Sequence, residues 1–343
     1  PECCTQGDSH YWGVWWGELP FEMWEEKTGR FMSEYGFQSY PSMATIVSFT
    51  NDKERNLNSA AMKNHQKHAR GVQIINKALD QYFYIPEKFT DYVYLSQLVQ
   101  AYGIGQAIEV HRRKQPHCMG TLYWQLNDCW PVASWSSIDY YGRWKALQYE
   151  AKRQFEPIIL TTAPLQGNEL PIYAINDSAK TIQASLQIRL CNFDGSITDS
   201  VYIDSISLPG RSAVEISRFS PSKKIKINKL TKQYLHLKLF DAKGRLLAQK
   251  VYFYLYPKQM EFLPKGISTQ VQRLNASTKE EQYIFTLSAE QIKYGVAITT
   301  NLNGRFSDNY FTLLPGEEKQ VIFTPAAPAK VQMKYNVKSF GKE

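Results

Sequence analysis

The chain has 343 residues, of which 43% are hydrophobic and 21% are charged, and its formal net charge at pH 7 is +8. This balance is typical of a globular protein and excludes a disordered chain, which would be poorer in apolar residues. No run of about 18 apolar residues occurs, so we expect no membrane span. The basic excess makes nucleic acid a partner to be considered.

The first part of the chain, up to about residue 155, mixes a short strand pattern with helical patterns. A strand is predicted at about 30–34, and Glu34 stands at its end among apolar neighbours. Helices are predicted within about 55–113. Near the start of that range Ser59 is a candidate N-cap, and Gly71 is a candidate helix stop.

A long helix with a buried face is predicted where Leu95, Leu98 and Tyr102 recur at helical spacing. The apolar run at about 118–125 then predicts a strand in a sheet that is covered on both faces. A further helix is predicted at about 143–155. The order strand, helices, strand, helix is the repeating unit of a parallel α/β fold. Two strands are too few for a stable open sheet, so we expect them to pair with something else.

Beyond Pro157 the pattern changes to short alternating runs separated by turn signals. The stretch "LFDAKGRLLA" predicts a hairpin. Strands at this spacing indicate a β-sandwich of about 100 residues, which we place at 157–258. A Pro- and Gly-containing linker leads to a second strand-rich module at 259–343. The predicted class is therefore α/β followed by all-β.

Basic residues are concentrated between 216 and 250, where ten Lys or Arg stand against one acidic residue, Asp241. The stretch from Lys232 to Leu239 alternates with period two and predicts a strand with one wet face. We interpret the charge as a solvated strand face and expect no nucleic acid partner. The alternative, a polyanion-binding patch, would bind heparin or nucleic acid in a salt-sensitive way.

Glu34 and Trp124 are the candidate functional residues that spacing alone suggests. In a parallel β/α barrel the carboxyl ends of the strands line the active site, and each residue would stand at such an end. A carboxylate beside an indole is a usual arrangement for sugars, because the ring stacks on C–H faces while the acid performs chemistry. A salt bridge to a neighbouring residue is the structural alternative for Glu34.

Two longer motifs make the sugar interpretation specific. The segments "SEYGFQSYP" and "WQLNDCWPVASWSSIDYYGRWKALQY" stand in this order along the chain. Together they resemble the β-mannosidases of glycoside hydrolase family 2. The resemblance implies the C-terminal portion of a (β/α)8 TIM barrel over 1–156. An immunoglobulin-like β-sandwich over 157–258 and a small C-terminal β-sandwich-like domain over 259–343 would follow.

The resemblance also implies roles for single residues. Glu34 matches the catalytic nucleophile of a retaining enzyme, and Trp124 would line the sugar subsite. Trp16 stands where family members often have Tyr or His, so it offers an N–H in place of a hydroxyl or imidazole. His10 and Trp12 lie in a loop that the family folds toward the active-site mouth. Asp128 is a further substrate-site candidate, although bracing of its loop by hydrogen bonds is the favoured interpretation.

The mechanism needs two carboxyls about 5 Å apart, and a second one is not evident here. In the family the acid/base is a Glu directly after an Asn on an earlier strand. Asn168-Glu169 is the one such pair, and it lies in the β-rich part. Glu22, Glu25 and Glu26 are the nearest other acids and are expected on the surface. We therefore expect the chain to be the C-terminal part of a larger enzyme and to be inactive alone.

The resulting hypothesis is a retaining exo-β-mannosidase that removes terminal β-linked mannose from a glycan or manno-oligosaccharide, without metal or organic cofactor. The alternatives are an exo-β-glucosaminidase or β-galactosidase of the same family, or a non-catalytic carbohydrate-binding fragment. The oligomeric state is not predicted. A periplasmic, secreted or lysosomal parent protein is expected, and in such a compartment Asn176 and Asn275 would fit the N-glycosylation pattern.

Overall fold

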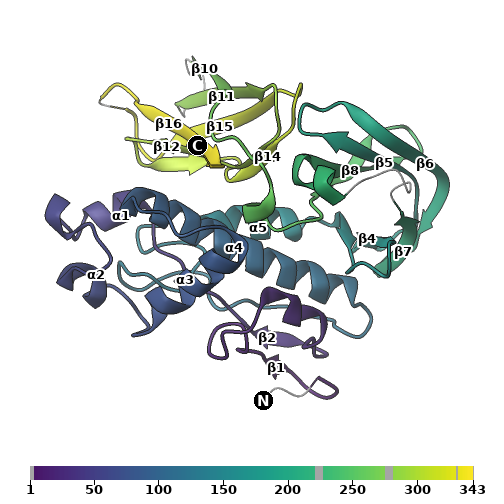
Figure 1. The fold of residues 1–343 in the computed structure, drawn as a ribbon, viewed down its shortest axis with the longest axis horizontal. Coiled ribbons are helices and arrows are strands. Elements are labelled where there is room, and N and C mark those ends of the chain that lie inside the picture. The colour runs from purple at the N-terminus through teal and green to yellow at the C-terminus, as the bar shows by residue number, and fades with distance from the viewer. Residues whose placement is uncertain (1–3, 221–226, 275–280, 330, 343) are drawn as a thin grey trace. The chain divides into compact units, whose positions relative to one another are not determined.

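The computed structural model describes residues 4–220, 227–274, 281–329 and 331–342. It contains both helices and sheets (Figure 1), so the predicted mixed class is confirmed. The chain forms two compact units. The first consists of Pro1–Ile188, Ser200–Ile225 and His236–Tyr252, and the second of Arg189–Asp199, Lys226–Leu235 and Phe253–Glu343.

The α-helices all belong to the first unit. They are α1 (Met43–Val47), α2 (Ala60–Asn64), α3 (Gly71–Tyr82), α4 (Phe89–Arg113) and α5 (Ala146–Gln154), with 3-10 turns at Phe21–Glu25 and Asp52–Glu54. Helix α4 is the long helix that Leu95, Leu98 and Tyr102 predicted, and most of its residues are buried. It has Asp91 in its first turn and three basic residues in its last turn. These charges stabilise the helix, because each is opposite in sign to the helix dipole at its end.

The break between α2 and α3 corrects one prediction. Ser59 is the N-cap of α2, since its hydroxyl accepts a hydrogen bond from the Met62 N–H at 3.2 Å. Gly71, however, opens α3 instead of ending α2. The chain between the helices pairs with a distant loop, because Gln66 forms a parallel bridge with Ala133. This tertiary pairing overrides the helical pattern.

The short strands β1 (Ser9–His10) and β2 (Met32–Glu34) run parallel, with His10 opposite Glu34. On the other side of β2, the Met32 N–H donates to the Gly120 carbonyl at 2.9 Å, and the Leu122 N–H donates to the Met32 carbonyl at 2.8 Å. The parallel contact is a single bridge between Met32 and Thr121.

The continuous, doubly covered strand expected at 118–125 is therefore wrong in part. Met119, Leu122 and Trp124 are exposed. Within the described ranges β2 is the strand that pairs with this segment, so its other edge and its outward side chains stay uncovered. An apolar run shows that its side chains favour burial. It does not show which other segments pack against them.

After α5 the chain forms two sheets. The strands are β3 (Ile158–Thr162), β4 (Leu170–Asn176), β5 (Ile182–Asn192), β6 (Ile197–Leu208), β7 (Ser212–Phe219), β8 (Gln233–Asp241) and β9 (Leu246–Tyr252). One sheet has the order β3-β4-β7 and the other β6-β5-β8-β9. The predicted hairpin joins β8 to β9. At its turn Gly244 takes a positive φ of 76°, and Asp241 accepts hydrogen bonds from the backbone N–H groups of Lys243 and Arg245.

The wet face predicted for β8 is wrong, because Tyr234 and His236 are buried. Strand β8 lies between β5 and β9, and His236 contacts Gln249 of β9 at 3.2 Å. Alternation with a period of two residues indicates a strand. It does not show that the more polar face of that strand is exposed to solvent. Tyr and His can be covered as readily as Leu when a neighbour packs over them.

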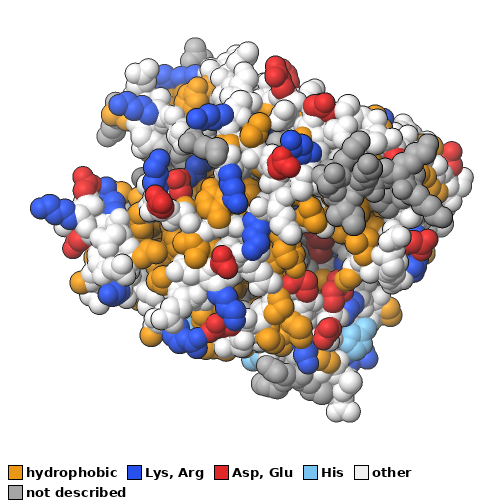
Figure 2. Space-filling model, in the orientation of Figure 1, with side chains coloured by type: hydrophobic (Ala, Val, Ile, Leu, Met, Phe, Trp, Pro, Cys, Tyr) orange, Lys and Arg blue, Asp and Glu red, His pale blue; other side chains and the backbone are white. Residues whose placement is uncertain are grey.

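Several basic residues of the 216–250 stretch pair with carboxylates. Arg218 pairs with Glu215 at 2.6 Å, and Lys232 pairs with Glu261 at 2.8 Å. Lys223, Lys224 and Lys226 of the same stretch lie outside the described residues. Figure 2 shows Lys and Arg interspersed with Asp and Glu on the face turned to the viewer. Mixed signs give a weaker field than a single-sign patch would.

The strands of the second unit complete the fold. They are β10 (Ile267–Leu274), β11 (Gln282–Ala289), β12 (Lys293–Thr300), β13 (Gly304–Phe306), β14 (Phe311–Leu313), β15 (Lys319–Pro325) and β16 (Tyr335–Phe340), preceded by 3-10 turns at Ile227–Lys232 and Pro257–Gln259. They form sheets of order β10-β11-β15-β13 and β14-β12-β16. Phe285, Leu287, Val296 and Phe323 are buried in this unit.

Within the first unit, the C-terminal end of α4 is tied to the strands that follow. Arg112 pairs with Asp177 at 2.7 Å, and Arg113 donates to the Thr162 carbonyl at 2.7 Å. Lys250 of β9 pairs with Glu109 of α4 at 2.6 Å. No helix in the described part of the chain is long and apolar enough to cross a membrane.

Candidate active site

Glu34 ends β2, and its side chain is 31% exposed. Its backbone is fixed by the parallel pairing with β1, where the Tyr11 N–H donates to the Glu34 carbonyl at 2.9 Å. The carboxylate therefore projects from a paired strand end and still reaches solvent. This position agrees with the strand-end location that the sequence predicted.

Two ring nitrogens from the β1 side approach the same oxygen of the Glu34 carboxylate. Trp12 Nε1–H donates to Oε2 at 3.3 Å, and His10 Nδ1 lies 3.4 Å from Oε2. Among the described residues, Oε1 has no hydrogen-bond or ion-pair partner. One oxygen is thus anchored, and the other is available to a reacting group.

His10 also approaches a second carboxylate. Its Nε2 lies 3.4 Å from Asp8 Oδ2, so the imidazole ring stands between Asp8 and Glu34. Ser33 Oγ–H donates to the same Asp8 oxygen at 2.6 Å. This hydrogen bond, together with the nearby His10, holds the pKa of Asp8 below its usual value. The chain Asp8–His10–Glu34 orients the imidazole from both sides.

Gly36 explains how the strand end and the Trp124 segment meet. A Cβ at position 36 would lie 2.2 Å from the Trp124 carbonyl oxygen and 3.2 Å from the Trp135 ring. Only glycine leaves room for this approach. The Trp124 N–H donates to the Tyr35 carbonyl at 2.8 Å, which fixes the two segments side by side. The Trp124 side chain is 44% exposed and open to a ligand.

Trp16 is placed differently from the expectation. Its ring is 54% exposed and packs edge-on against His68, with ring centroids 4.6 Å apart. Within the described residues no hydrogen bond joins Trp16 to Glu34. The indole that donates to the carboxylate is Trp12, which sequence reasoning placed near the site without assigning it this role. Trp12 and Glu34 are 22 positions apart in the sequence, and no local signal predicts the contact.

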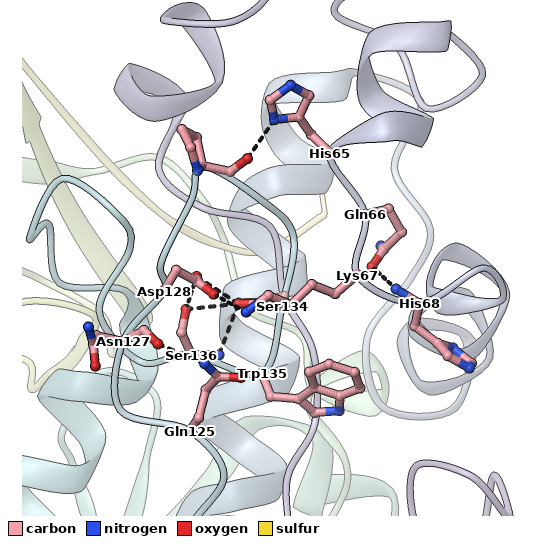
Figure 3. A network of polar contacts seen from close by, with 12 residues as sticks. His65, Gln66, Lys67, His68, Gln125, Asn127, Asp128, Ser134, Trp135 and Ser136 are labelled. Atoms are coloured by element: carbon pink, nitrogen blue, oxygen red, sulfur yellow. Dashed lines mark hydrogen bonds and ion pairs between the residues drawn. The ribbon is translucent and has the colours of Figure 1, made fainter.

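Asp128 lies in a buried network at the loop after Trp124 (Figure 3). Lys67 Nζ is 2.9 Å from Oδ1, and the hydroxyls of Ser134 and Ser136 donate to Oδ2 at 2.7 and 2.5 Å. The Asp128 side chain is only 1% exposed. Both carboxylate oxygens are occupied, so these contacts fit loop bracing and not direct contact with substrate.

Lys145 is a buried cation behind this network. Its ammonium donates to the Ser39 and Ser134 carbonyls at 3.3 Å each. Burial lowers the pKa of Lys145 to about 7, although the charges of Asp128 and Asp139 oppose the shift. The residue joins the segment after β2 to the loop after Trp124.

The other acids are committed elsewhere or exposed. Glu22 accepts a hydrogen bond from Tyr82 Oη at 2.9 Å, and Glu25 pairs with Arg113. Glu26 is exposed, as expected. Asn168-Glu169 stands at a turn before β4, where Glu169 approaches Arg218 at 3.8 Å. None of these contacts brings a second carboxyl to Glu34.

The structure also bears on the two N-glycosylation patterns and on metal binding. Asn176 is fully buried and donates through Nδ2 to three backbone carbonyls, so in the folded chain it is not open to glycosylation. Asn275 lies outside the described residues. Within the described ranges, no group of three or more His, Cys, Asp or Glu side chains could hold a metal ion.

Comparisons with known proteins show what the sequence and the fold of this chain are similar to. A family model described as a Mannosidase Ig/CBM-like domain matches residues 168–259, and one described as an Ig-fold domain of mannosidases matches 263–341. The β-mannosidase of Capra hircus is 27% identical over 96% of this chain and 38% of its own length. The β-mannosidase B of Thermothelomyces thermophilus is 26% identical over 91% and 39%. The chain is a relative of the β-mannosidases.

Solved structures agree with this relationship. The β-D-mannosidase of Dictyoglomus thermophilum has a TM-score of 0.84 and 28% identity, covering 96% of this chain and 40% of its own. An exo-chitosanase from Amycolatopsis orientalis has a TM-score of 0.74 at 17% identity, covering 94% and 44%, which shows a shared fold alone. The resemblance to β-mannosidases indicated by the two motifs is thus confirmed. The chain spans about two fifths of the length of the curated β-mannosidases it matches.

Proposed function

We propose that the protein containing this chain is a retaining exo-β-mannosidase, with Glu34 as its nucleophile. The observation that carries the proposal is the Glu34 carboxylate itself. It stands at a parallel strand end, is anchored through one oxygen, and leaves the other oxygen free beside the exposed Trp124 segment. The similarity to β-mannosidases along nearly the whole chain supports the choice of substrate.

In the proposed reaction, Glu34 Oε1 attacks the anomeric carbon of a terminal β-mannosyl residue. The bond from that carbon to the leaving oxygen breaks as a second carboxyl gives the oxygen its proton. Water, deprotonated by the same second carboxyl, then displaces Glu34 and restores the carboxylate. Trp12 and His10 act as positioning residues, since they hold Oε2 while Oε1 changes its bonding.

The second carboxyl is proposed to come from outside these 343 residues. A retaining enzyme needs it about 5 Å from the nucleophile, and the described contacts of Glu22, Glu25 and Glu169 engage them elsewhere. On this proposal residues 1–156 are the C-terminal portion of a (β/α)8 barrel. Residues 157–258 and 259–343 are the two β-domains that follow. Activity then belongs to the whole protein, and this chain alone is inactive.

Trp124 is proposed to stack on the sugar bound at Glu34, and Asp128 to brace the loop that carries this indole. Trp16 is proposed to lie at the rim of the site, farther from the reacting bond than Trp124. Its exposed ring, which packs on His68, supports this place. No metal or organic cofactor enters this chemistry. The proposed ligand is a β-mannoside glycan or oligosaccharide.

The decisive test replaces Glu34 in the full-length protein. Glu34→Gln should lower kcat/KM for an aryl β-mannoside by about 10³-fold or more, because the amide is a poor nucleophile. Glu34→Ala supplied with azide should form the α-mannosyl azide, since azide would attack from the vacated face. Glu26→Gln removes an exposed carboxylate nearby and should leave the rate unchanged. A Glu34→Gln protein that keeps its rate would remove Glu34 from the mechanism.

Substrate choice is tested with a panel of aryl β-glycosides. We expect the mannoside to be hydrolysed with the highest kcat/KM. A higher value for the glucosaminide or the galactoside would replace the mannosidase assignment with one of the two related activities. Failure of the full-length protein to cleave any of them, with binding retained, would favour the non-catalytic carbohydrate-binding alternative.

A further inference from the structure

A cleft of about 660 Å³ lies on the outer side of the sheet β6-β5-β8-β9, within the first compact unit. Three strands supply its floor and walls: β5 through Gln183, Ser185 and Gln187, β6 through Tyr202, Asp204 and Ser205, and β8 with its turn through residues 240–242 and 244. Its volume is in the range that holds a small ligand. No role in the proposed hydrolysis involves it.

Tyr202 gives the cleft a fixed aromatic wall. The side chain is 57% exposed, so a ligand in the cleft can reach the ring. Its hydroxyl donates to Ser185 Oγ on the neighbouring strand at 2.9 Å. The ring is therefore held in place before any ligand arrives, and little conformational freedom remains to be lost on binding.

The backbone of β6 is arranged to turn two consecutive side chains toward the cleft. Ser205 takes a left-handed φ of 59°, which is costly for a residue with a Cβ. Before it the exposed cleft residues are Tyr202 and Asp204, and after it the buried positions are Ile206 and Leu208. The in–out alternation shifts by one residue at Ser205. Strand irregularities of this kind re-aim side chains and gather near functional sites.

The chemistry of the lining selects the class of ligand. It offers amides from Gln183 and Gln187, hydroxyls from Ser185 and Ser205, and the Asp204 carboxylate, with no Lys or Arg among the lining residues. Among the described residues, the side chains of Asp204 and Gln187 have no hydrogen-bond or ion-pair partner, so both can bind a ligand. Such donors and acceptors match the hydroxyls of a sugar, and the carboxylate disfavours an anion.

We propose that this cleft is a second carbohydrate site, which binds a neutral glycan by stacking one sugar ring on Tyr202 and hydrogen-bonding its hydroxyls to Asp204 and the two glutamines. The aromatic face attracts the C–H groups of a pyranose because the ring carries negative charge above its plane. The site holds the glycan without cleaving it. This role is separate from Glu34, and it stands or falls independently of the proposed hydrolysis.

The test is affinity electrophoresis of the full-length protein in gels that contain soluble galactomannan, glucomannan, hydroxyethylcellulose or dextran sulfate. Every protein carries Glu34→Gln, so that the polymer stays intact and the proposed active site is the same throughout. We expect retardation by at least one neutral polymer. Tyr202→Ala should raise the dissociation constant about tenfold or more, as for other central aromatic contacts, whereas Tyr202→Phe keeps the ring and should retain most of the affinity.

Two controls make the result specific. Ile197→Ala alters an exposed residue of the same strand outside the cleft lining and should leave retardation unchanged. Thermal unfolding of each variant shows whether the fold is intact. Equal retardation of the parent and of a folded Tyr202→Ala protein would overturn the proposal, as would retardation by dextran sulfate alone or by no polymer. If Tyr202→Ala does not fold, a folded Asp204→Ala protein with unchanged affinity would overturn it equally.

Discussion

Glu34 and Asp128 are both carboxylates in the candidate active-site region, yet the protein treats them in opposite ways. Asp128 is 1% exposed and has both oxygens engaged by Lys67 and two serine hydroxyls. Glu34 is 31% exposed, has one oxygen held by Trp12 and His10, and has the other free. A buried carboxylate with both oxygens engaged contributes structure, whereas one with a free oxygen at a rigid strand end is prepared for chemistry.

The largest effect on stability expected from this comparison is at Asp128. Asp128→Asn removes the charge that compensates Lys67 and disturbs two short hydrogen bonds. Loss of one partner of a buried pair should lower the free energy of unfolding by about 3 kcal/mol. Denaturant unfolding of the variant and the parent measures the difference.

The control for Asp128 is an ion pair on the surface. Asp52 pairs with Arg55, but its side chain is 91% exposed, so Asp52→Asn should change stability by less than about 1 kcal/mol. If the two variants lose equal stability, the distinction between a bracing carboxylate and an ordinary surface one is not valid.

A smaller effect, on rate and not on stability, is expected at Trp12. Trp12→Phe removes the N–H that holds Glu34 Oε2 and keeps an aromatic ring against Trp135. A hydrogen bond to a charged group contributes about 1.5–3 kcal/mol, so kcat/KM for a β-mannoside should fall about 10- to 100-fold. Trp16→Phe makes the same change at an exposed indole that does not contact Glu34, and it should cost much less. Steady-state kinetics of the full-length proteins compares them, and the reverse order would assign the donor role to Trp16.

The effect that is smallest per step of the measurement is a pH dependence of stability, and it concerns Lys145 beside the buried Asp128 network. Because burial lowers the pKa of Lys145 to about 7 in the folded chain, whereas an exposed lysine has a pKa of 10.5, the unfolded chain binds the extra proton between these pH values. Stability from Lys145 should therefore rise as pH increases from 7, by at most about 1.4 kcal/mol per pH unit. Lys145→Met should remove this rise. Denaturant unfolding at pH 7, 8 and 9 gives the slopes, and parallel slopes for both proteins would contradict the prediction.

The sequence predicted those parts of the fold that depend on residues close together in the chain, such as helix caps, helical spacing and turns. Ser59 caps α2, the spacing of Leu95 and Leu98 marks α4, and the Asp-Ala-Lys-Gly sequence forms the β8–β9 turn. Glu34 could be singled out because a strand of apolar residues ends in an acid. In each case the residues that make the structure lie within a few positions of one another.

Contacts between distant segments were beyond the reach of the sequence. The Trp12–Glu34 hydrogen bond spans 22 residues, and the pairing of Gln66 with Ala133, which ends α2 early, spans 67. Tyr234 and His236 look solvated by alternation, yet they are covered by packing. Periodicity reports what one segment prefers, and it cannot report which other segment will cover it or supply a donor.

The end of α4 has a consequence for attempts to divide or recombine proteins of this kind. Arg112 and Arg113 are each only 5% exposed, and they reach Asp177 and the Thr162 carbonyl, while Glu109 reaches Lys250. Cutting the chain after α5 would separate Arg112 and Glu109 from these charged partners, whereas Arg113 would lose the Thr162 carbonyl and keep its ion pair with Glu25. A graft that exchanges the following sheets between relatives should therefore include both partners of these ion pairs, because the contacts are specific to this sequence.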